Sequence, residues 1–364
     1  MEPTFVILHV ARIQNEPGSG VQVIVPEHIR AQQPYAAAAL LNLAQDPVRG
    51  GQAFDYTARF PDDLPPPFCR PDIVIFHEVY RLAYPAIART LRKRSIPYVV
   101  VPHGSRTAAA QTLRAWKKRP ANWLMFNRFV RNAAAIQCLS QKEFDETRDE
   151  RKFIGTNGMR IPDRRKTQFS DTVRTIVYIG RLDRYYKGLD LLMDAVAKCQ
   201  AFLRAHHCRI DLYGPDSGGS ARELARRIHA LGVADVVTLN GAAFDAAKTE
   251  ILLRADCFIQ TSRSEGMPVG LLEAMSCGLP CIVTDGTGLA EYVAAYDAGW
   301  CCRTDADAIA AAILTAVREG RLPEKSRNAV RLVRENFDWD AAARAAVQKY
   351  KEIASAVHLP KAGG

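Results

Sequence analysis

Short apolar runs alternate along the chain with longer amphipathic or alanine-rich stretches. Such runs predict buried strands, and the stretches between them predict helices. Alternation of single strands with helices favours a parallel, doubly wound α/β sheet. In the first half, predicted strands occupy residues 5–10, 72–77, 98–101 and 135–139, with a further apolar run at 21–25. Predicted helices of this half occupy residues 33–43, 84–94 and 141–148.

The alternation lapses at the charged residues 163–168 and restarts at residue 173. We interpret the charged segment as a linker between two Rossmann-like domains, residues 1–165 and 172–338. A last helical pattern, residues 339–358, is expected to pack on one domain or across both. In the second domain, predicted strands occupy residues 173–179, 209–213, 236–239, 256–261 and 281–284, and predicted helices occupy 189–203 and 221–231.

Two glutamates follow the predicted strand 256–261. Glu265 lies in the loop after this strand, and Glu273 lies in the next helix, a rise of about 11 Å further on. The two carboxylates could reach opposite ends of a ligand, and free N–H groups at the helix start suit phosphate or sugar oxygens. The alternative is an ordinary strand–helix unit with two solvated glutamates. Gly266 and Gly270 favour a ligand site, because they provide backbone freedom that a simple connector does not need.

Composition limits the classes of protein that fit. A chain of 364 residues, 48% of them hydrophobic, can bury two cores, and it contains no run of eighteen apolar residues. Residues 1–8 lack the basic start of a signal peptide. Nine cysteines without a Cys-x-x-Cys pair make a poor disulfide framework. We therefore expect a cytoplasmic protein.

Positive charge is concentrated in the first half. Residues 1–170 hold 25 Lys and Arg against 15 Asp and Glu, whereas the remaining residues hold 24 of each. Between Glu78 and Glu143 there are thirteen basic residues and no acid. Such a field attracts polyanions, anionic lipid headgroups or phosphorylated substrates.

Basic and aromatic residues are interleaved in residues 114–130. They predict either a surface that lies on an anionic membrane or a buried helix with a solvated basic face. His103 follows the predicted strand 98–101, at the sheet edge where α/β proteins bind ligands. It either contacts a substrate there or is a turn histidine bonded to backbone.

Three strand ends of the second domain carry chemistry. Arg181 and Lys187 lie in one strand-to-helix loop, where two cations and a helix N-terminus could cradle a diphosphate. Solvated loop cations are the alternative. Gly214 and Gly241 each follow a strand and would let a flat ring approach the backbone.

These motifs, taken in order, resemble the retaining family-4 glycosyltransferases with the GT-B fold. The resemblance is carried by Gly180-Arg181, Lys187-Gly188, Tyr213-Gly214 and the run from Glu265 to Pro280, with Pro102-His103-Gly104 and Asn157-Gly158 before them. It implies two Rossmann-like domains that face each other across a cleft. It also implies metal-independent transfer of a sugar, with retention, from a nucleotide-diphosphate sugar to a lipid-linked or saccharide acceptor. The expected setting is bacterial surface-polysaccharide or glycoconjugate synthesis on the inner face of the cell membrane.

The resemblance also assigns residues on the donor side. Glu273 would bind the ribose hydroxyls of the nucleotide. Glu265, together with the backbone peptide groups of Gly266, Met267 and Pro268, would hold the hydroxyls of the donor sugar.

Further residues are assigned to the diphosphate and its surroundings. Arg181 and Lys187 would neutralise the departing diphosphate without a metal, and no other cofactor is expected. His103 would face the donor sugar. The loop with Gly18 and Gly20 would approach the diphosphate or the acceptor from the first domain.

Other functions have weaker support in the sequence. Residues 305–307 read Asp-Ala-Asp, which could bind a metal, but a helix N-cap explains them better. Zinc-hydrolase and serine-esterase motifs do not occur. A non-enzymatic polyanion or membrane binder would account for the basic half but not for the strand-end residues, and nucleic acid is not expected. A sugar-nucleotide epimerase of the same fold would not need the basic half.

Overall fold

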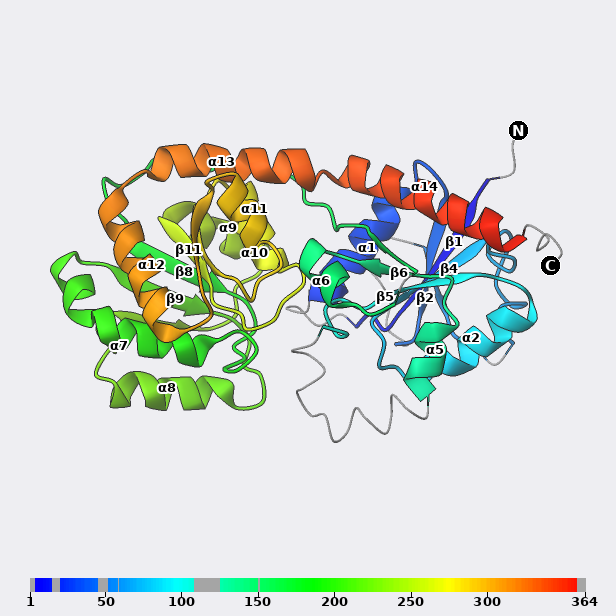
Figure 1. Ribbon diagram of the computed structural model, residues 1–364, viewed down its shortest axis with the longest axis horizontal. Helices are drawn as coiled ribbons and strands as arrows, with labels where there is room; N and C mark the ends of the chain where they lie inside the picture. The colour runs from blue at the N-terminus through cyan, green and yellow to red at the C-terminus, as the bar shows by residue number, and fades with distance from the viewer. Residues whose placement is uncertain are drawn as a thin grey trace. The chain divides into compact units, whose positions relative to one another are not determined.

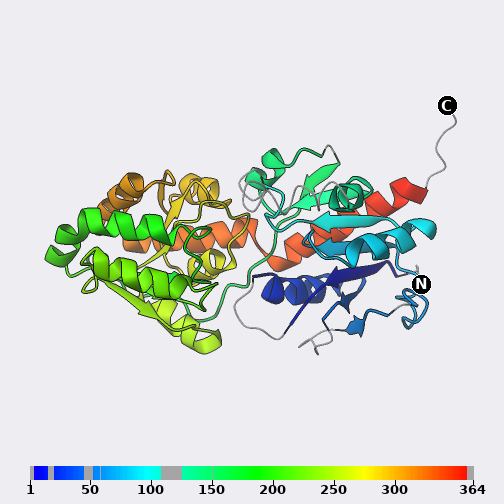
Figure 2. The same ribbon diagram turned by 90° about the horizontal axis from the view of Figure 1, so that it is seen from below.

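A computed structural model describes residues 4–14, 20–44, 52–57, 59–107, 125–149 and 151–358. Its described residues divide into two compact units. The first domain combines the residues before Met159 with those from Trp339 onward, and the second domain is Met159–Asp338. Each domain is an α/β unit built on one sheet, as Figures 1 and 2 show.

The sheet of the first domain has seven parallel strands in the order β3-β2-β1-β4-β5-β6-β7. The order reverses between β1 and β4, which makes this pair the topological switch point. Strand bounds are β1 Val6–Ala11, β2 Ala37–Asn42, β3 Ala53–Asp55, β4 Ile73–His77, β5 Tyr98–Val101, β6 Ala135–Cys138 and β7 Lys152–Ile154. Helix bounds are α1 Gly20–Gln32, α2 Tyr84–Lys93, α5 Asn127–Arg131, α6 Gln141–Glu146 and α14 Trp339–His358.

Two expectations for the first domain are wrong. The apolar run at 21–25, which the pattern offered as strand-like, lies inside helix α1. The predicted helix 33–43 is instead strand β2, which pairs in parallel with β1 over its whole length. Both corrections have one cause: packing and strand pairing override the local preferences of β-branched residues and alanine.

The second domain has six parallel strands in the order β10-β9-β8-β11-β12-β13. Its switch point lies between β8 and β11. Strand bounds are β8 Thr175–Ile179, β9 Arg209–Tyr213, β10 Val237–Asn240, β11 Cys257–Gln260, β12 Cys281–Thr284 and β13 Gly299–Cys302. Helix bounds are α7 Leu189–Ala205, α8 Ser220–Ala230, α9 Asp245–Arg254, α10 Val269–Ser276, α11 Ala290–Ala295, α12 Ala306–Glu319 and α13 Leu322–Asn336.

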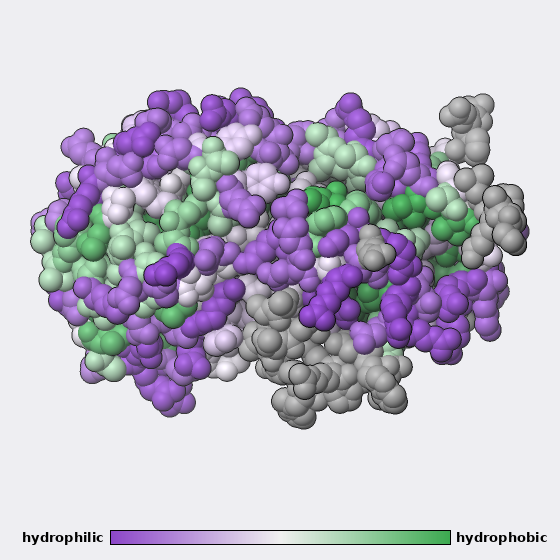
Figure 3. All heavy atoms as spheres, viewed as in Figure 1, coloured by the Kyte–Doolittle hydropathy of each residue, from purple (hydrophilic) through white to green (hydrophobic). Residues whose placement is uncertain are grey.

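Helix ends in the second domain follow local sequence rules. Asp305 caps helix α12, because its carboxylate accepts the N–H of Ala308 at 2.8 Å. The N-cap prediction for residues 305–307 is therefore confirmed. Helix α13 has the exposed residues Arg327, Arg331 and Arg334 on one face. In Figure 3, hydrophilic residues gather along the upper edge of the second domain, where Figure 1 shows this helix. Its opposite face buries Leu332 among other residues.

The last helix of the chain, α14, belongs to the first domain. It packs along α1, so that the red and blue ends of the chain lie side by side in Figure 1. Trp339, the first residue of α14, packs directly on Gly158, because a Cβ on Gly158 would collide with its indole ring. Within the second domain, the N–H of Met159 donates to the carbonyl of Phe337 at 2.6 Å. None of the described helices is long and apolar enough to cross a membrane.

Candidate functional site

The loops after β8 and β11 meet at the switch point of the second domain. Glu265 lies in the loop after β11, and its carboxylate is bonded to the ammonium of Lys187, from the loop after β8. Gln260 Nε2 and Ser262 Oγ donate to the second carboxylate oxygen of Glu265, at 3.0 and 2.8 Å. The Lys187 and Glu265 side chains are 16% and 21% exposed, so this pair is shielded from water on most sides but reachable.

Gly188 makes the approach of the two loops possible. Its φ of +62° places it in the left-handed region just before α7, and a Cβ there would run into the carbonyl oxygen of Thr261. The hydroxyl of Thr261 in turn donates to the carbonyl of Lys187 at 2.9 Å. The Lys187-Gly188 pair is therefore required by backbone contact between the loops as well as by charge.

A second ion pair joins the loop after β11 to the first turn of α7 and was not found from the sequence. The guanidinium of Arg263 forms a bidentate pair with Asp190, at 2.6 and 3.0 Å. It also stacks over the ring of Tyr185, 4.4 Å from the ring centroid, and donates to the Tyr185 carbonyl at 2.8 Å. The ring of Tyr185 thus serves as a platform for Arg263, and the carbonyl of Tyr186 accepts the backbone N–H of Arg263 at 3.0 Å.

Glu273 lies on α10 and is bonded to the ammonium of Lys248 on α9. The Glu273 side chain is 27% exposed and that of Lys248 is 22% exposed. Lys248 was also missed, because nothing in its helical surroundings marks it before the fold brings α9 to α10. Each glutamate of the predicted pair therefore forms an ion pair with one lysine.

The remaining predicted residues of the second domain lie at the same edge of the sheet. Gly214 follows β9, and a Cβ on it would collide with the carbonyl of Gly180. Arg181 is exposed, and among the described residues its side chain has no hydrogen bond or ion pair. The hydroxyl of Tyr178 donates to its carbonyl at 2.8 Å, which fixes the backbone of this loop.

Gly266, Met267 and Pro268 are buried and lead directly into α10. Pro268 is the N-cap residue of that helix rather than part of its first turn. Of the two glycines expected in the first domain, Gly18 lies outside the described residues. Gly20 begins helix α1 and is exposed.

His103 lies in the first domain, directly after β5. Its φ is +51°, and its Nε2 lies 3.0 Å from Nδ1 of His77. The loop is held by Glu143, which accepts the N–H of Gly104 at 2.6 Å and whose pKa burial raises. Burial lowers the pKa of His103 to about 3, so that the imidazole is neutral at physiological pH.

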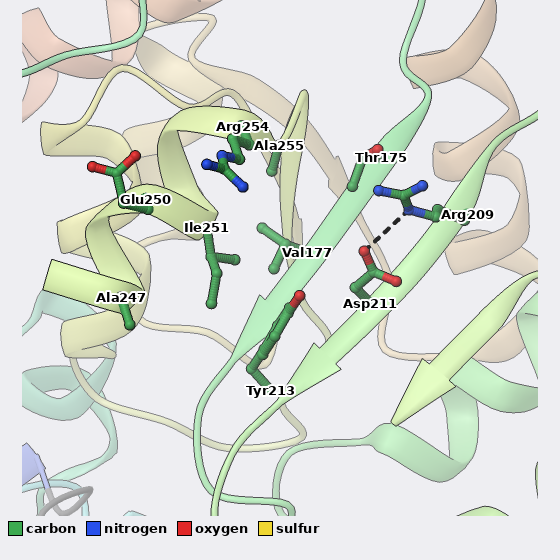
Figure 4. Close-up of a pocket in the computed structure, with 10 residues that line it drawn as sticks. All are labelled: Thr175, Val177, Arg209, Asp211, Tyr213, Ala247, Glu250, Ile251, Arg254 and Ala255. Carbon is green, nitrogen blue, oxygen red and sulfur yellow. Dashed lines mark hydrogen bonds and ion pairs between the residues drawn. The ribbon is translucent and has the colours of Figure 1, made fainter. Parts of the chain in front are cut away.

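Two surface hollows lie elsewhere on the second domain. One, of about 380 Å³, lies between α9 and the strands β8 and β9, where Arg209 and Asp211 form an ion pair (Figure 4). The other, of about 920 Å³, is lined by residues 163–168 together with side chains of α9 and α13. Neither lining includes Glu265 or Glu273. Within the described ranges no group of three or more His, Cys, Asp or Glu could hold a metal.

Comparison with protein families covers most of the chain. The model described as "Glycosyl transferases group 1" matches residues 159–333. The model described as "Glycosyl transferase 4-like domain" matches residues 3–154. The two matches follow the two domains of the structure closely.

Three curated relatives illustrate the range of similar proteins. An uncharacterized glycosyltransferase of Methanocaldococcus jannaschii is 28% identical over 52% of this chain and 47% of its own length. The putative teichuronic acid biosynthesis glycosyltransferase TuaC of Bacillus subtilis is 26% identical over 74% of this chain and 67% of its own. A GDP-mannose:cellobiosyl-diphosphopolyprenol alpha-mannosyltransferase of Komagataeibacter xylinus is 27% identical over 52% and 49%. The chain thus matches about half the length of the first and third of these relatives.

Solved structures show the same fold at low sequence identity. Sucrose-phosphate synthase from Thermosynechococcus elongatus superposes with a TM-score of 0.75 at 17% identity, over 97% of this chain and 100% of that one. The Anabaena protein HepE, in complex with UDP and glucose, gives a TM-score of 0.72 at 19% identity, over 95% and 99%. The chain therefore has the GT-B fold that its sequence predicted.

Proposed function

Because this chain belongs to the group 1 glycosyl transferases, we propose that it moves a sugar from a nucleotide-diphosphate sugar to a lipid-linked or saccharide acceptor. The observation that carries the proposal is the pairing of Lys187 with Glu265 at the switch point between β8 and β11. Parallel α/β sheets bind their ligands at this place. The Anabaena relative by fold, HepE, binds UDP and glucose according to its description, which supports a nucleotide-sugar donor.

The charges at the edge of the second domain fit the parts of such a donor. Lys187 would meet the diphosphate beside the N-terminus of α7, together with the guanidinium of Arg181, which has no side-chain partner in the described part of the chain. Glu265 would accept hydrogen bonds from sugar hydroxyls, and the amides at the start of α10 would add donors. Glu273, which lies further along α10, would accept hydrogen bonds from the ribose hydroxyls.

The chemistry follows from where charge develops. As the nucleoside diphosphate leaves, negative charge grows on its oxygens, and fixed cations stabilise that transition state more than the ground state. Arg181 and Lys187 can supply this stabilisation without a metal. We propose a retaining reaction with front-face attack, in which Glu265 orients the sugar and is not a nucleophile. Three donors hold the Glu265 carboxylate, which favours orientation over covalent attack.

The acceptor is proposed from charge and from relatives. The acid-free basic stretch between Glu78 and Glu143 suits a phosphorylated lipid carrier or an anionic membrane surface. Residues 108–124 of this stretch lie outside the described residues. The names of the Bacillus and Komagataeibacter relatives refer to teichuronic acid and to a diphosphopolyprenol. We infer a cytoplasmic enzyme, peripheral on the membrane, in polysaccharide or glycoconjugate synthesis.

The donor is tested by measuring thermal stability against a panel of nucleotide sugars, since a bound ligand raises the melting temperature by mass action. Turnover of the best ligand is then followed in variants. Glu273→Ala should raise the donor KM, and Arg181→Ala should lower kcat. Glu291→Ala and Arg226→Ala, both exposed on other helices, are the matched controls. Unchanged turnover in both site variants would overturn the assignment, and conversion of the sugar without any acceptor would point to an epimerase.

The membrane is tested separately by co-sedimentation with vesicles of neutral lipid and of neutral lipid mixed with phosphatidylglycerol. Binding that requires the anionic lipid and weakens when the salt concentration is raised from about 50 to about 500 mM supports the proposal, because salt screens the attraction between charges. Absence of salt-sensitive binding would remove it.

A further inference from the structure

Buried polar side chains of the first domain form one continuous hydrogen-bonded chain that ends at His103. His9 on β1 lies at its centre: His9 Nδ1 is 2.9 Å from His77 Nε2, and His9 Nε2 is 2.9 Å from Gln32 Oε1. His77 Nδ1 is in turn 3.0 Å from His103 Nε2. His9 and Gln32 are fully buried, and His77 is 2% exposed. The chain crosses the sheet at the switch point between β1 and β4.

The chain has a direction, because its far end is fixed by a backbone carbonyl. Gln137 Nε2 donates to the carbonyl of Gly155 at 2.8 Å, an oxygen that can only accept. The other end of this amide, Gln137 Oε1, therefore faces the hydroxyl of Tyr350 on α14 as an acceptor, at 2.5 Å. Tyr350 is fully buried, and its hydroxyl donates its one hydrogen to the bond with Gln137.

Gln32 carries the direction onward. Because the hydroxyl hydrogen of Tyr350 is directed at Gln137, the hydroxyl oxygen accepts a hydrogen bond from the side chain of Gln32. The amide nitrogen of Gln32 also lies 3.2 Å from His28 Nδ1. Gln32 therefore turns its carbonyl oxygen to His9, and His9 must carry its proton on Nε2.

The position of the proton on His9 determines which ring nitrogen donates and which accepts in the next two histidines. Burial, and to a smaller extent the charge of neighbouring histidines, lowers the pKa of His9 to about 3 and that of His77 well below its usual value. Each ring is thus neutral and has one N–H and one lone pair. His9 accepts on Nδ1 from the Nε2–H of His77, and His77 accepts on Nδ1 from the Nε2–H of His103. What remains on His103 is the lone pair of Nδ1, which has no partner among the residues described.

We propose that Gln32, His9 and His77 are positioning residues that hold His103 as its Nε2–H tautomer, so that Nδ1 accepts a hydrogen bond from a hydroxyl of the donor sugar. The sugar contact rests on the proposed function, whereas the tautomer does not. The device selects chemistry: a ligand group that donates fits Nδ1, and a group that can only accept does not. We expect kcat/KM to fall about tenfold or more for a ligand that lacks this hydroxyl. We expect the same loss in a variant in which the direction of the hydrogen bonds is reversed.

The tautomer is measured by NMR of the full chain with ¹⁵N,¹³C-labelled histidine at pH 7. The expected result is that His9, His77 and His103 all show the Nε2–H signature. An Nδ1–H or a charged His103 would overturn the proposal, whether or not the protein transfers sugar.

The direction is tested with Tyr350→Phe, which keeps the ring and removes the anchor hydroxyl. His103 should then show a mixture of both tautomers. Tyr98→Phe is the matched control, because Tyr98 is equally buried but donates to the carbonyl of Phe129, at 2.6 Å, outside the chain. A Tyr350→Phe variant with an unchanged His103 signature would refute the role of α14. Gln32→Leu provides a second disruption should Tyr350→Phe not fold.

The sugar contact is tested with monodeoxy analogues of the donor. Wild-type protein should lose about tenfold or more in kcat/KM for one analogue, and Gln32→Leu should no longer distinguish that analogue from the donor. Equal discrimination in both proteins would contradict the positioning role. A correct tautomer in a protein without transfer activity would instead contradict the proposed function and leave the histidine chain intact.

Discussion

The ammonium of Lys187 is bonded to the carboxylate of Glu265, 78 positions further along the chain. The pair joins the loop after β8 to the loop after β11, so that the cation proposed for the diphosphate and the acid proposed for the sugar hydroxyls lie next to each other. The arrangement places two opposite charges at adjacent points of one sheet edge.

Removing the charge of Glu265 tests this pair. Glu265→Gln leaves the Lys187 ammonium without its counter-ion in a site that is mostly shielded from water, so we expect a loss of about 1–2 kcal/mol in the free energy of unfolding. Urea unfolding measures this loss. Asp307→Asn, which breaks an exposed lysine–aspartate pair, is the control and should leave the midpoint unchanged. Equal effects of the two variants would show that the Lys187–Glu265 pair behaves as a surface contact.

The bidentate pair between Arg263 and Asp190 should matter for turnover as well as for folding. Asp190→Asn keeps the size of the side chain but weakens both hydrogen bonds that tie the β11 loop to α7. We expect kcat/KM for the donor to fall roughly tenfold, since about 1.4 kcal/mol of loop positioning is lost. Asp235→Asn removes the equivalent bidentate pair on an exposed surface and should leave kcat/KM at the wild-type value.

Gly214 and Gly241 offer a matched pair of strand-end glycines. A Cβ on Gly214 would collide with the Gly180 carbonyl, whereas one on Gly241 would meet no atom within 4 Å. Gly214→Ala should therefore destabilise the second domain by about 1–3 kcal/mol, and Gly241→Ala should have little effect. Thermal unfolding of both variants decides the matter. Equal melting temperatures would mean that the Gly180 loop can move aside at no cost.

The buried histidines predict a loss of stability in acid. Burial lowers the folded-state pKa of His9 and His103 to about 3 and that of His28 to about 4, each from an ordinary value near 6.5. Below pH 6.5 the unfolded chain therefore binds protons that the folded chain does not. Stability should fall as the pH drops from 6.5 towards 4, by up to ~1.4 kcal/mol per pH unit for each such histidine.

Urea unfolding at pH 7.5, 6.0 and 5.0 checks this slope. His28→Gln should flatten it, because one proton-binding group of the unfolded chain is removed. His229→Gln, at an exposed position on α8, makes the same substitution outside the buried cluster. A slope that is identical in wild type and His28→Gln would rule out His28 as a source of acid lability.

The sequence predicts those strands that are short apolar runs between turn residues, whereas β2 was predicted as a helix and β3, β7 and β13 were not predicted. Strands β5, β9 and β12 have the bounds that the pattern predicted. Helix α1 shows the limit of the method. Its buried positions, Val25 and Ile29 among them, have helical spacing, but the β-branched start of the segment and Pro26 hide that period in a short window.

The candidate site was predictable only as far as motifs reach. The resemblance named Glu265 and Lys187, but their mutual bond depends on strand order, which spacing along the chain does not reveal. Lys248 and Asp190 carry no local mark, because each acquires its partner only when two helices or loops are brought together. The histidine chain is a stronger case, since its members come from separate elements of the first domain and nothing in any one of those segments points to the others.

The position of α14 has a consequence for how the protein is made. Ribosomal synthesis produces the whole second domain, Met159–Asp338, before α14 emerges, a delay of about 10–40 s at typical bacterial rates. During that time the first domain lacks Tyr350, and the side of α1 that α14 contacts is uncovered. The domain that begins the chain is thus completed only after the second domain, and the proton of His103 is oriented only once α14 has been added.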